Sequence, residues 1–419
     1  MTEKLLQYIW QFRHFNISGL VTVHGESLYI IHPGRLNSNQ GPDFLESRIR
    51  IGNTEWAGNI ELHIHASDWE QHRHSDDKNY LNIILHVVWK NDKELSLPFP
   101  TLELQPFVPG ILLNRYEMLM HSTAFIPCHT GIARVPYLHF AAWKERLLTE
   151  RLQQRSDHIM SQLNENVQHW EEVFWWLLAR NFGIRINAGA FEAIARSIPL
   201  TILAKHKNQL HQVEALLLGQ AAILDTAFKE AYPAMLRKEY NFLQKKYGLQ
   251  KPHLPVYYLR MRPANFPTVR LAQLAMLIHR SIHLFAVVRE AADLKEVTAL
   301  FNIAAGEYWD DHYLPDHTTA HKKKNLGVQM MQNILINTIV PVLYAYGYYH
   351  SNRSMQEKAL RWLEQIAPEH NSITKGFTAL GIVNKNAFDS QALIQLRNEY
   401  CNEKKCLACA VGNWLLKAK

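Results

Sequence analysis

The 419-residue sequence contains no run of about 18 consecutive apolar residues, and its first residues lack the pattern of a secretory signal peptide. We therefore expect no membrane-spanning segment and a cytoplasmic protein. Cysteine is also scarce, with four residues in the whole chain. Because cytoplasmic thiols stay reduced, we expect no disulfide framework, and clustered cysteines favour metal binding instead.

The sequence has no strong excess of one charge, since 45 basic residues are interspersed with 38 acidic ones, for a net charge of +7. This balance is compatible with a polyanionic partner such as nucleic acid but favours it only slightly. Self-similarity at a fixed period is also lacking, which argues against a solenoid. The hydrophobic content of 47% is enough for two or three domains with separate cores.

Two adjacent segments near the N-terminus have the pattern of paired β-strands. Residues 44–51 alternate apolar and polar side chains, the Gly-Asn pair that follows is typical of a two-residue hairpin turn, and residues 55–65 form the returning strand. Alternation along the second strand places Glu61 and His63 on one face. The first strand begins just after Asp43, so we expect Asp43 to lie close to Glu61 and His63.

These three residues are the candidate catalytic site. Carboxylate oxygens of Asp43 and Glu61 a few ångströms apart would bind a hard divalent cation, Mg²⁺ or Mn²⁺, which polarises a phosphate and activates a water. His63 would orient or deprotonate that water, or stabilise charge on the phosphate. A polar hairpin edge without any chemistry explains the same residues. Further polar residues nearby are secondary candidates: Gln40, His65, Asp68, His72, His74 and His86.

The order Pro-Asp43, then Glu61-Leu-His63 on the next strand, is similar to the signature of the PD-(D/E)xK nuclease superfamily. The core of that superfamily runs helix, three strands, helix, strand, and residues 2–89 offer elements in this order. The resemblance implies an α+β fold with a mixed-sheet, restriction-endonuclease-like core, and a divalent-metal-dependent nuclease acting on DNA or RNA. The sequence departs from the superfamily at His63, where the usual residue is lysine. Unlike lysine, histidine is mostly neutral at pH 7.

Two other functions are compatible with the same residues. A nuclease-like fold that binds nucleic acid without cutting it would explain the missing lysine. Alternatively, an imidazole-rich site of a different metalloenzyme would bind zinc, manganese or iron. Its ligands would come from His63, His65, His72, His74 and Asp68. The two metal sites differ at His65, which is essential only in the imidazole-rich one.

The apolar periodicity changes from strand-like to helix-like at Gly110. We therefore expect an N-terminal α/β core over residues 1–109 and a large all-helical region over residues 110–419. The whole chain also resembles an uncharacterised bacterial family, domain of unknown function family 2851, through the segments GPDF, NIELHIHASDW, NIILHVVW and YCNEKKCLAC. That resemblance implies no particular biochemistry.

The helical region ends in a cysteine-rich tail, in which Cys401, Cys406 and Cys409 have the spacing C-x4-C-x2-C. Two residues between thiolates let a turn close around one ion. The remaining cysteine, Cys128, is the expected fourth ligand, with the adjacent His129 as a weaker alternative. Zinc and an iron–sulfur cluster both accept four thiolates. Such a closed shell is structural rather than catalytic, and buried thiols without a metal are the other interpretation.

The arrangement of one remote and three terminal cysteines is similar to the iron–sulfur staple of some PD-(D/E)xK nucleases. In this sequence the remote cysteine lies on the opposite side of the nuclease-like motif from the usual order. The resemblance therefore implies a structural metal centre and leaves zinc and iron–sulfur both open.

Overall fold

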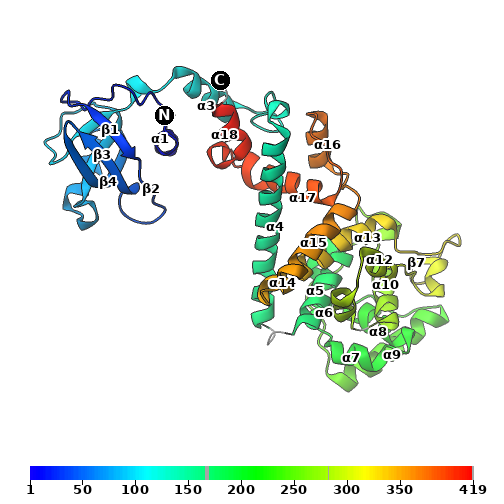
Figure 1. Cartoon of the computed structure of the whole chain (residues 1–419). Coiled ribbons are helices and arrows are strands. Elements are labelled where there is room, and N and C mark those ends of the chain that lie inside the picture. Colours follow the sequence, from blue (N-terminus) through cyan, green and yellow to red (C-terminus); the bar gives the residue numbers. More distant parts are fainter. Residues whose placement is uncertain (166–168, 282, 418–419) are drawn as a thin grey trace. The chain divides into compact units, whose positions relative to one another are not determined.

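The computed structural model describes residues 1–165, 169–281 and 283–417, and Figure 1 shows the course of the chain. The chain forms two compact units, Met1–Trp143 with Leu396–Lys419, and Lys144–Gln395. This division by packing differs from the division by sequence pattern between residues 109 and 110. The difference arises because the C-terminal segment folds back onto the first unit, where Tyr400 meets Trp143 edge to face with ring centres 5.2 Å apart.

The first unit is built on a six-stranded mixed sheet. Its strands, coloured blue to cyan in Figure 1, are β1 (Leu28–His32), β2 (Arg35–Leu36), β3 (Phe44–Ile51), β4 (Thr54–His65), β5 (Ile83–Lys90) and β6 (Thr101–Glu103). The strand order is β1-β3-β4-β5-β6, with β2 paired to β3. Strand β3 is antiparallel to β1 and β4, whereas β4, β5 and β6 are parallel. The predicted hairpin over residues 44–65 is confirmed, and its turn contains Gly52 at a φ of 55°.

Helices pack against this sheet and link its strands. Helix α1 (Glu3–Gln11) buries Trp10, whose indole donates to the carbonyl of Pro33 at 3.0 Å. Phe44 in β3 and Val87 in β5 are also fully buried, as expected of strands with apolar faces. The other helical segments of this unit are α2 (Asp68–Gln71), η1 (His74–Asp76), η2 (Lys78–Tyr80), η3 (Gln105–Phe107), α3 (Gly110–His121), η4 (Ile132–Arg134), η8 (Leu396–Cys401), η9 (Cys406–Ala408) and α18 (Ala410–Lys417).

The second unit is predominantly helical in its described residues, and the long helix α4 (Tyr137–Glu165) leads into it. Its further helices are α5 (Trp170–Phe182), α6 (Ile184–Arg196), α7 (Leu200–His206), α8 (Leu210–Gln220), α9 (Ala231–Tyr247), η5 (Pro263–Asn265), α10 (Pro267–Arg280), α11 (Leu284–Glu290), α12 (Leu294–Leu300), η6 (Glu307–Asp310), α13 (Val328–Ile334), η7 (Leu335–Ile339), α14 (Val340–Tyr349), α15 (Arg353–Gln365), α16 (Ser372–Ala379) and α17 (Ala387–Gln395). The expected helical region is confirmed. A two-stranded ribbon, β7 (His312–Leu314) with β8 (His317–Thr318), was not predicted.

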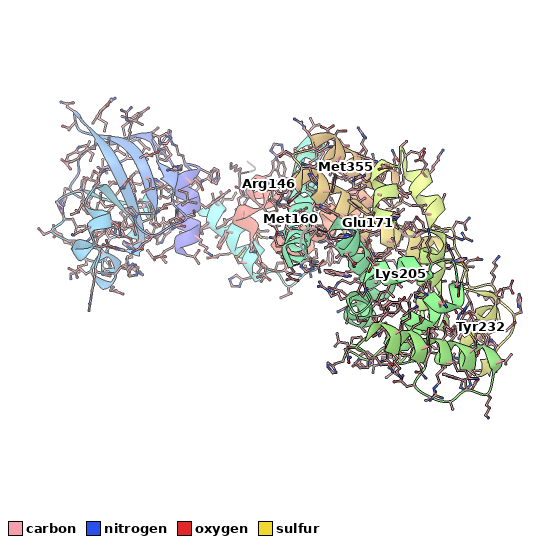
Figure 2. The ribbon with its side chains drawn as sticks, turned by 90° about the horizontal axis from the view of Figure 1, so that it is seen from below. Arg146, Met160, Glu171, Lys205, Tyr232 and Met355 are labelled. Atoms are coloured by element: carbon pink, nitrogen blue, oxygen red, sulfur yellow. The ribbon has the colours of Figure 1, made fainter. Side chains whose placement is uncertain are left out.

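Polar side chains join helices of the second unit. Glu171, on α5, accepts hydrogen bonds from the N–H groups of Phe285 and Ala286 at 3.2 and 2.9 Å, in the first turn of α11. The hydroxyl of Tyr232, on α9, donates to Glu214, on α8, at 2.8 Å. Glu171 and Tyr232 are labelled in Figure 2. Because an acid stabilises the positive end of a helix dipole, Glu171 fastens α11 to α5.

One continuous helical stretch in the described part of the chain, Val328–Tyr349, has the length and apolarity that a membrane span requires. It consists of α13, the π-helix η7 and α14. Within this stretch, 67% of the most apolar window is buried inside the protein. A helix that is apolar and buried in this way is also typical of a domain core, so the stretch is a weak candidate for a span.

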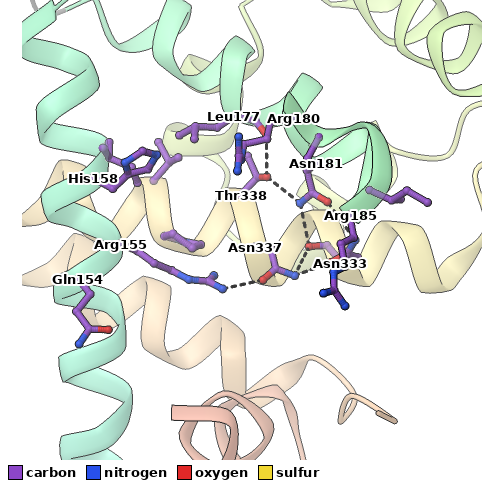
Figure 3. Close-up of a pocket in the computed structure, with 15 residues that line it drawn as sticks. Gln154, Arg155, His158, Leu177, Arg180, Asn181, Arg185, Asn333, Asn337 and Thr338 are labelled. Carbon is purple, nitrogen blue, oxygen red and sulfur yellow. Dashed lines mark hydrogen bonds between the residues drawn. The ribbon is translucent and has the colours of Figure 1, made fainter. Parts of the chain in front are cut away.

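A cavity of about 590 Å³ lies among α4, α5 and η7 (Figure 3). At its wall, Asn181 donates to the carbonyl of Asn333 at 3.2 Å and to the hydroxyl of Thr338 at 2.9 Å. Arg155 donates to the carbonyl of Ile336 at 3.2 Å. A π-helical turn disturbs the regular ladder of backbone hydrogen bonds. These side chains therefore hold η7 in place against α4 and α5.

Candidate metal centre

The register of the β3–β4 hairpin brings Asp43 beside Glu61. Phe44 pairs with Ile60, so Asp43, which precedes Phe44, faces Glu61, which follows Ile60. The N–H of Asp43 donates to Glu61 Oε2 at 2.9 Å, and the N–H of Leu62 donates to Asp43 Oδ2 at 3.1 Å. The two carboxylates therefore lie at one edge of the hairpin, as the sequence predicts.

A β-bulge lies next to this edge. The pairing of β3 with β4 shifts between Phe44 and Ser47, and Glu46 adopts a left-handed φ of 59°. The N–H of Glu46 donates to the side chain of Asn59 at 3.3 Å, which holds the irregular residue in place. Bulges of this kind re-aim neighbouring side chains and are frequent beside functional sites.

Glu61 is buried and Asp43 is half-buried, and their charges repel each other. Asp43 Oδ1 accepts a hydrogen bond from Gln7 at 2.8 Å, and Glu61 is only 6% exposed. Burial raises the pKa of Asp43 to about 6. Burial, together with the nearby Asp43 charge, raises the pKa of Glu61 to about 9. Because two neighbouring carboxylates repel each other once both are ionised, the pair either retains a proton or attracts a cation.

Four histidines cluster next to Glu61. His63 Nδ1 lies 2.8 Å from His86 Nε2, and His63 Nε2 lies 3.2 Å from His72 Nδ1. The ring of His74 stacks on that of His63 with centres 5.2 Å apart. The Nε2 atoms of His63 and His74 lie 3.7 and 3.5 Å from Glu61 Oε1. Glu61 thus has one oxygen toward the backbone of Asp43 and the other toward two imidazoles.

The segment that crosses from β4 to β5 delivers His72 and His74. Helix α2 ends at Gln71 with His72 as its C-cap, Arg73 has a left-handed φ of 56°, and η1 begins at His74. This single left-handed residue reverses the chain, so that both rings reach the same strand. Trp69 is buried against the histidines, and Tyr80 stacks on His74 with ring centres 4.0 Å apart.

Burial disfavours the charged form of three of these histidines, His63, His74 and His86. Burial lowers the pKa of His63 to about 2 and that of His86 to about 3, and the charges of neighbouring imidazoles act in the same direction. Burial also lowers the pKa of His74, with His72 contributing. A neutral His63 brings no positive charge toward a phosphate, but the neutral imidazole is the form that binds a metal ion.

The spacing of these atoms fits the shell of a single metal ion. Donors about 2.1 Å from a tetrahedral ion lie about 3.4 Å from one another. His63 Nε2 lies 3.2 Å from His72 Nδ1 and 3.7 Å from Glu61 Oε1, and His74 Nε2 lies 3.5 Å from the same Glu61 oxygen. One nitrogen from each of the three histidines lies within 4.8 Å of the other two. His74 Nε2 is buried and makes no hydrogen bond, so an ion would give it the partner that buried nitrogens require.

Three secondary candidates make contacts of a different kind. His65 is exposed, its N–H donates to Asp68 Oδ2 at 2.9 Å, and its ring lies 3.8 Å from the same carboxylate. Gln40 is exposed in the loop before Asp43, and its carbonyl accepts from Asn37 at 3.3 Å. The imidazole-rich cluster is therefore completed by Glu61 rather than by His65 and Asp68.

Gln7 and Tyr80 contact the site, and the sequence pattern did not single them out. Gln7 lies on α1, four residues after Glu3 and hence on the same helix face. The Glu3 charge adds to the rise in the pKa of Asp43, so this face of α1 looks toward the carboxylates. The four-residue spacing between Glu3 and Gln7, which puts both on one face of α1, is the sequence signal that would have identified Gln7. Tyr80 follows a polar loop, and its contact with His74 depends on the local reversal of the chain.

The four cysteines lie together in the first unit. All four are buried free thiols that line one small cavity: Cys128, Cys401, Cys406 and Cys409. The adjacent His129 is exposed and is not among the residues that line the cavity. Of the two alternatives for the fourth member of the group, the structure therefore selects Cys128.

Comparison with known proteins identifies a family. No curated protein and no solved structure matches the chain. The family described as "Protein of unknown function (DUF2851)" matches residues 3–372, a range that includes both carboxylates and all four clustered histidines. Because the match extends over most of the sequence, the chain belongs to this family, DUF2851.

Proposed function

We propose that this protein is a divalent-metal-dependent nuclease whose ion binds at Glu61, His63, His72 and His74. The observation that carries the proposal is the convergence of these four donors beside Asp43. The order of elements supports it, because α1, β1, β3, β4, α2 and β5 occur in the order helix, three strands, helix, strand, apart from the two-residue strand β2 after β1 and the short η1 and η2 before β5. This order is similar to the core of the PD-(D/E)xK nucleases. Asp43 precedes the second of these strands, and Glu61 lies on the third.

The donor set favours a transition-metal ion over Mg²⁺. Three imidazole nitrogens and one carboxylate oxygen suit manganese, iron or zinc, whereas Mg²⁺ prefers oxygen ligands and water. With four protein donors, an ion that accepts six ligands, such as Mn²⁺, would leave positions for a water and a phosphate oxygen, whereas a tetrahedral ion would leave none. This ligand set extends the pair of carboxylates expected from the sequence, because the crossing segment adds His72 and His74.

The chain's own groups have separate roles around the ion. A divalent ion supplies a Lewis acid that polarises the phosphate and lowers the pKa of water. Asp43, with a pKa raised by burial to about 6, is ionised at neutral pH and basic enough to accept a proton from the attacking water. Its N–H holds one oxygen of Glu61, which leaves the other for the ion. His63 Nδ1 lies 2.8 Å from His86 Nε2, and when His63 Nδ1 is the donor of this bond, His63 Nε2 has a free lone pair for a metal ion.

The test is a nuclease assay of the full chain on single- and double-stranded DNA and RNA, with Mn²⁺, Mg²⁺ or Zn²⁺ and with a chelator. We expect cleavage that requires metal, and a loss of at least about 100-fold in Asp43→Asn and Glu61→Gln. His65→Ala is the matched control, because His65 lies on the same strand but is exposed and pairs with Asp68. Equal cleavage by wild type and Asp43→Asn would refute the catalytic assignment.

Metal binding is measured separately by isothermal titration of the metal-free protein. His74→Ala should weaken Mn²⁺ binding by more than about 10- to 100-fold, the range for losing a group that only supports a metal ligand, whereas His65→Ala should leave it unchanged. Stoichiometric binding that depends on His74, without cleavage of any nucleic acid, would point to a metalloenzyme with another substrate.

A nuclease-like protein that binds nucleic acid without cutting it is the second candidate function. The observation that favours it is the neutral state of His63 at a position where the superfamily has a charged lysine. This candidate predicts that labelled oligonucleotides shift in a gel with EDTA present, that Glu61→Gln leaves the shift unchanged, and that no metal produces cleavage. Metal-dependent turnover by the wild type would exclude it.

A further inference from the structure

The chain's four cysteines form a second group of metal-binding side chains, separate from the histidine cluster. Cys128 lies in the loop before η4, whereas Cys401, Cys406 and Cys409 lie on η8, on η9 and just before α18. All four are between 6% and 8% exposed, and they are the only cysteines in the sequence. We propose that they form a four-thiolate metal centre that fastens the Cys128 loop to the C-terminal segment.

The backbone around the three C-terminal cysteines folds so that all three line one small cavity. Lys404 has a left-handed φ of 49° between Cys401 and Cys406, and the N–H of Cys409 donates to the carbonyl of Cys406 at 3.3 Å. A Cβ atom at Gly412 would lie 2.2 Å from the Cys406 carbonyl oxygen. The first turn of α18 therefore approaches η9 so closely that position 412 requires glycine.

The surroundings of the sulfur atoms suit thiolates that share a cation. Burial raises the pKa of Cys409, and the N–H groups of Val411 and Gly412, which donate to its sulfur, act in the opposite direction. Burial, and then the charges of the neighbouring thiols, raise the pKa of Cys128 and Cys406 to about 12. Four buried thiolates repel one another, so the ionised group requires a bound cation to offset its charge.

The lining of the cavity selects the kind of metal. Besides the thiols, the walls include the apolar side chains of Pro127, Leu396 and Val411, and no carboxylate or imidazole is among the lining residues. Hard ions such as Mg²⁺ and Ca²⁺ need oxygen ligands, which this site does not offer. Four thiolates are the donor set of structural zinc and of iron–sulfur clusters. With all four positions filled by protein, the centre is structural.

The first experiment is metal analysis of purified full-length protein, prepared with and without air, together with an absorbance spectrum. We expect either about one zinc per chain, or iron with acid-labile sulfide and visible absorbance, as the four-thiolate donor set implies. Cys128→Ser should lose this metal, whereas the adjacent exposed His129→Ala should retain it. Glu61→Gln separates the two sites, because it should leave the thiol-bound metal in place. Equal metal content in Cys128→Ser and wild type would overturn the proposal.

A measurement on the wild-type protein covers the case in which the cysteine variant does not fold. In the native protein, a disulfide reagent should react slowly with the four thiols until a strong chelator or a mercurial removes the metal. Metal release and thiol modification should then rise together, which a colorimetric zinc or iron indicator records. Rapid reaction of all four thiols in the untreated, folded protein, with no metal released, would overturn the proposal. Neither result depends on nuclease activity.

Discussion

The affinity of the histidine cluster for a metal ion should still increase with pH above pH 7, where the affinity of most histidine sites no longer depends on pH. A typical imidazole ligand competes with protons below about pH 6.5. Here the pKa of His63 is lowered to about 2 and that of His74 is also lowered, so these rings are already neutral. The proton that must leave belongs to Glu61, whose pKa burial and the Asp43 charge raise to about 9.

The magnitude follows from this pKa. A pH of 7 is about two units below the pKa of Glu61, so removing the proton from this carboxyl costs about 2.7 kcal/mol, at 1.36 kcal/mol per unit. Because the ion binds the deprotonated form, the apparent association constant should rise about tenfold per pH unit until the pH approaches 9. Between pH 7.0 and 8.5 the gain should be about 25-fold, because the rise levels off as the pH nears the pKa of Glu61. In Glu61→Gln this slope should disappear, since glutamine has no proton to release.

The assay is competition for Mn²⁺ between the metal-free protein and a fluorescent chelator, in oxygen-free buffers at pH 7.0, 7.75 and 8.5, with the chelator calibrated at each pH. Isothermal titration in two buffers of different ionisation enthalpy counts the protons released, and we expect close to one near pH 7.5. His65→Ala should have the same slope as the wild type. A flat affinity in the wild type, or the same slope in wild type and Glu61→Gln, would refute the assignment of Glu61 as the titrating group beside the ion.

Three further predictions concern stability. Without metal, the pKa of Glu61 is raised in the folded state, so the folded protein keeps a proton that the unfolded chain releases above about pH 4.5, and the free energy of unfolding falls as the pH rises toward 9. In urea at pH 8.5, Glu61→Gln should therefore be more stable than the wild type by about 2–5 kcal/mol. Equal urea midpoints for the two proteins would contradict this prediction. Gly412→Ala should lower the Tm and release thiol-bound metal, whereas Gly110→Ala, where a Cβ has nothing within 4 Å, should change neither. Asn181→Ala should reduce the free energy of unfolding by about 1–3 kcal/mol because it leaves the Thr338 hydroxyl and a backbone carbonyl without their donor, and an unchanged unfolding curve would show that the cavity network of Figure 3 adds no stability.

The hairpin with its two carboxylates could be predicted because its determinants are local. Period-2 alternation fixes which face each side chain takes, and the Gly52 turn fixes the register. Together they place Asp43 next to Glu61 before any tertiary contact is considered. The grouping of the three C-terminal cysteines could likewise be predicted from their spacing. Cys128 could be predicted as the fourth member because the chain has no other cysteine.

The positions of the crossing-segment histidines could not be predicted in the same way. His72 and His74 are two residues apart in a polar loop, a spacing that in regular structure says little about where their rings point. Their convergence on His63 depends on the left-handed backbone of Arg73, a conformation that an arginine adopts only when the surrounding packing imposes it. The exposed pair of His65 and Asp68 looked equivalent in the sequence. In the structure, only His72 and His74 approach His63. His65 lies two residues beyond His63 on β4, where the strand is exposed to solvent.

The replacement of lysine by His63 is physically consistent with the rest of the site. A buried pair of carboxylates needs positive charge nearby, and a lysine on the same strand would supply it directly. Here the residue at that position is a neutral imidazole that bonds to His86 and lies beside Glu61, so it cannot offset the charge of the pair. The same neutral ring, joined by His72 and His74, can instead hold an ion with a charge of two. Under the proposed function, a bound cation at this site would take the place of the positive charge that a lysine supplies in the PD-(D/E)xK nucleases. If this reasoning is correct, His63→Lys should bind Mn²⁺ more weakly than the wild type and should also lower the pKa of Glu61, which nuclear magnetic resonance of the labelled carboxyl carbon would detect.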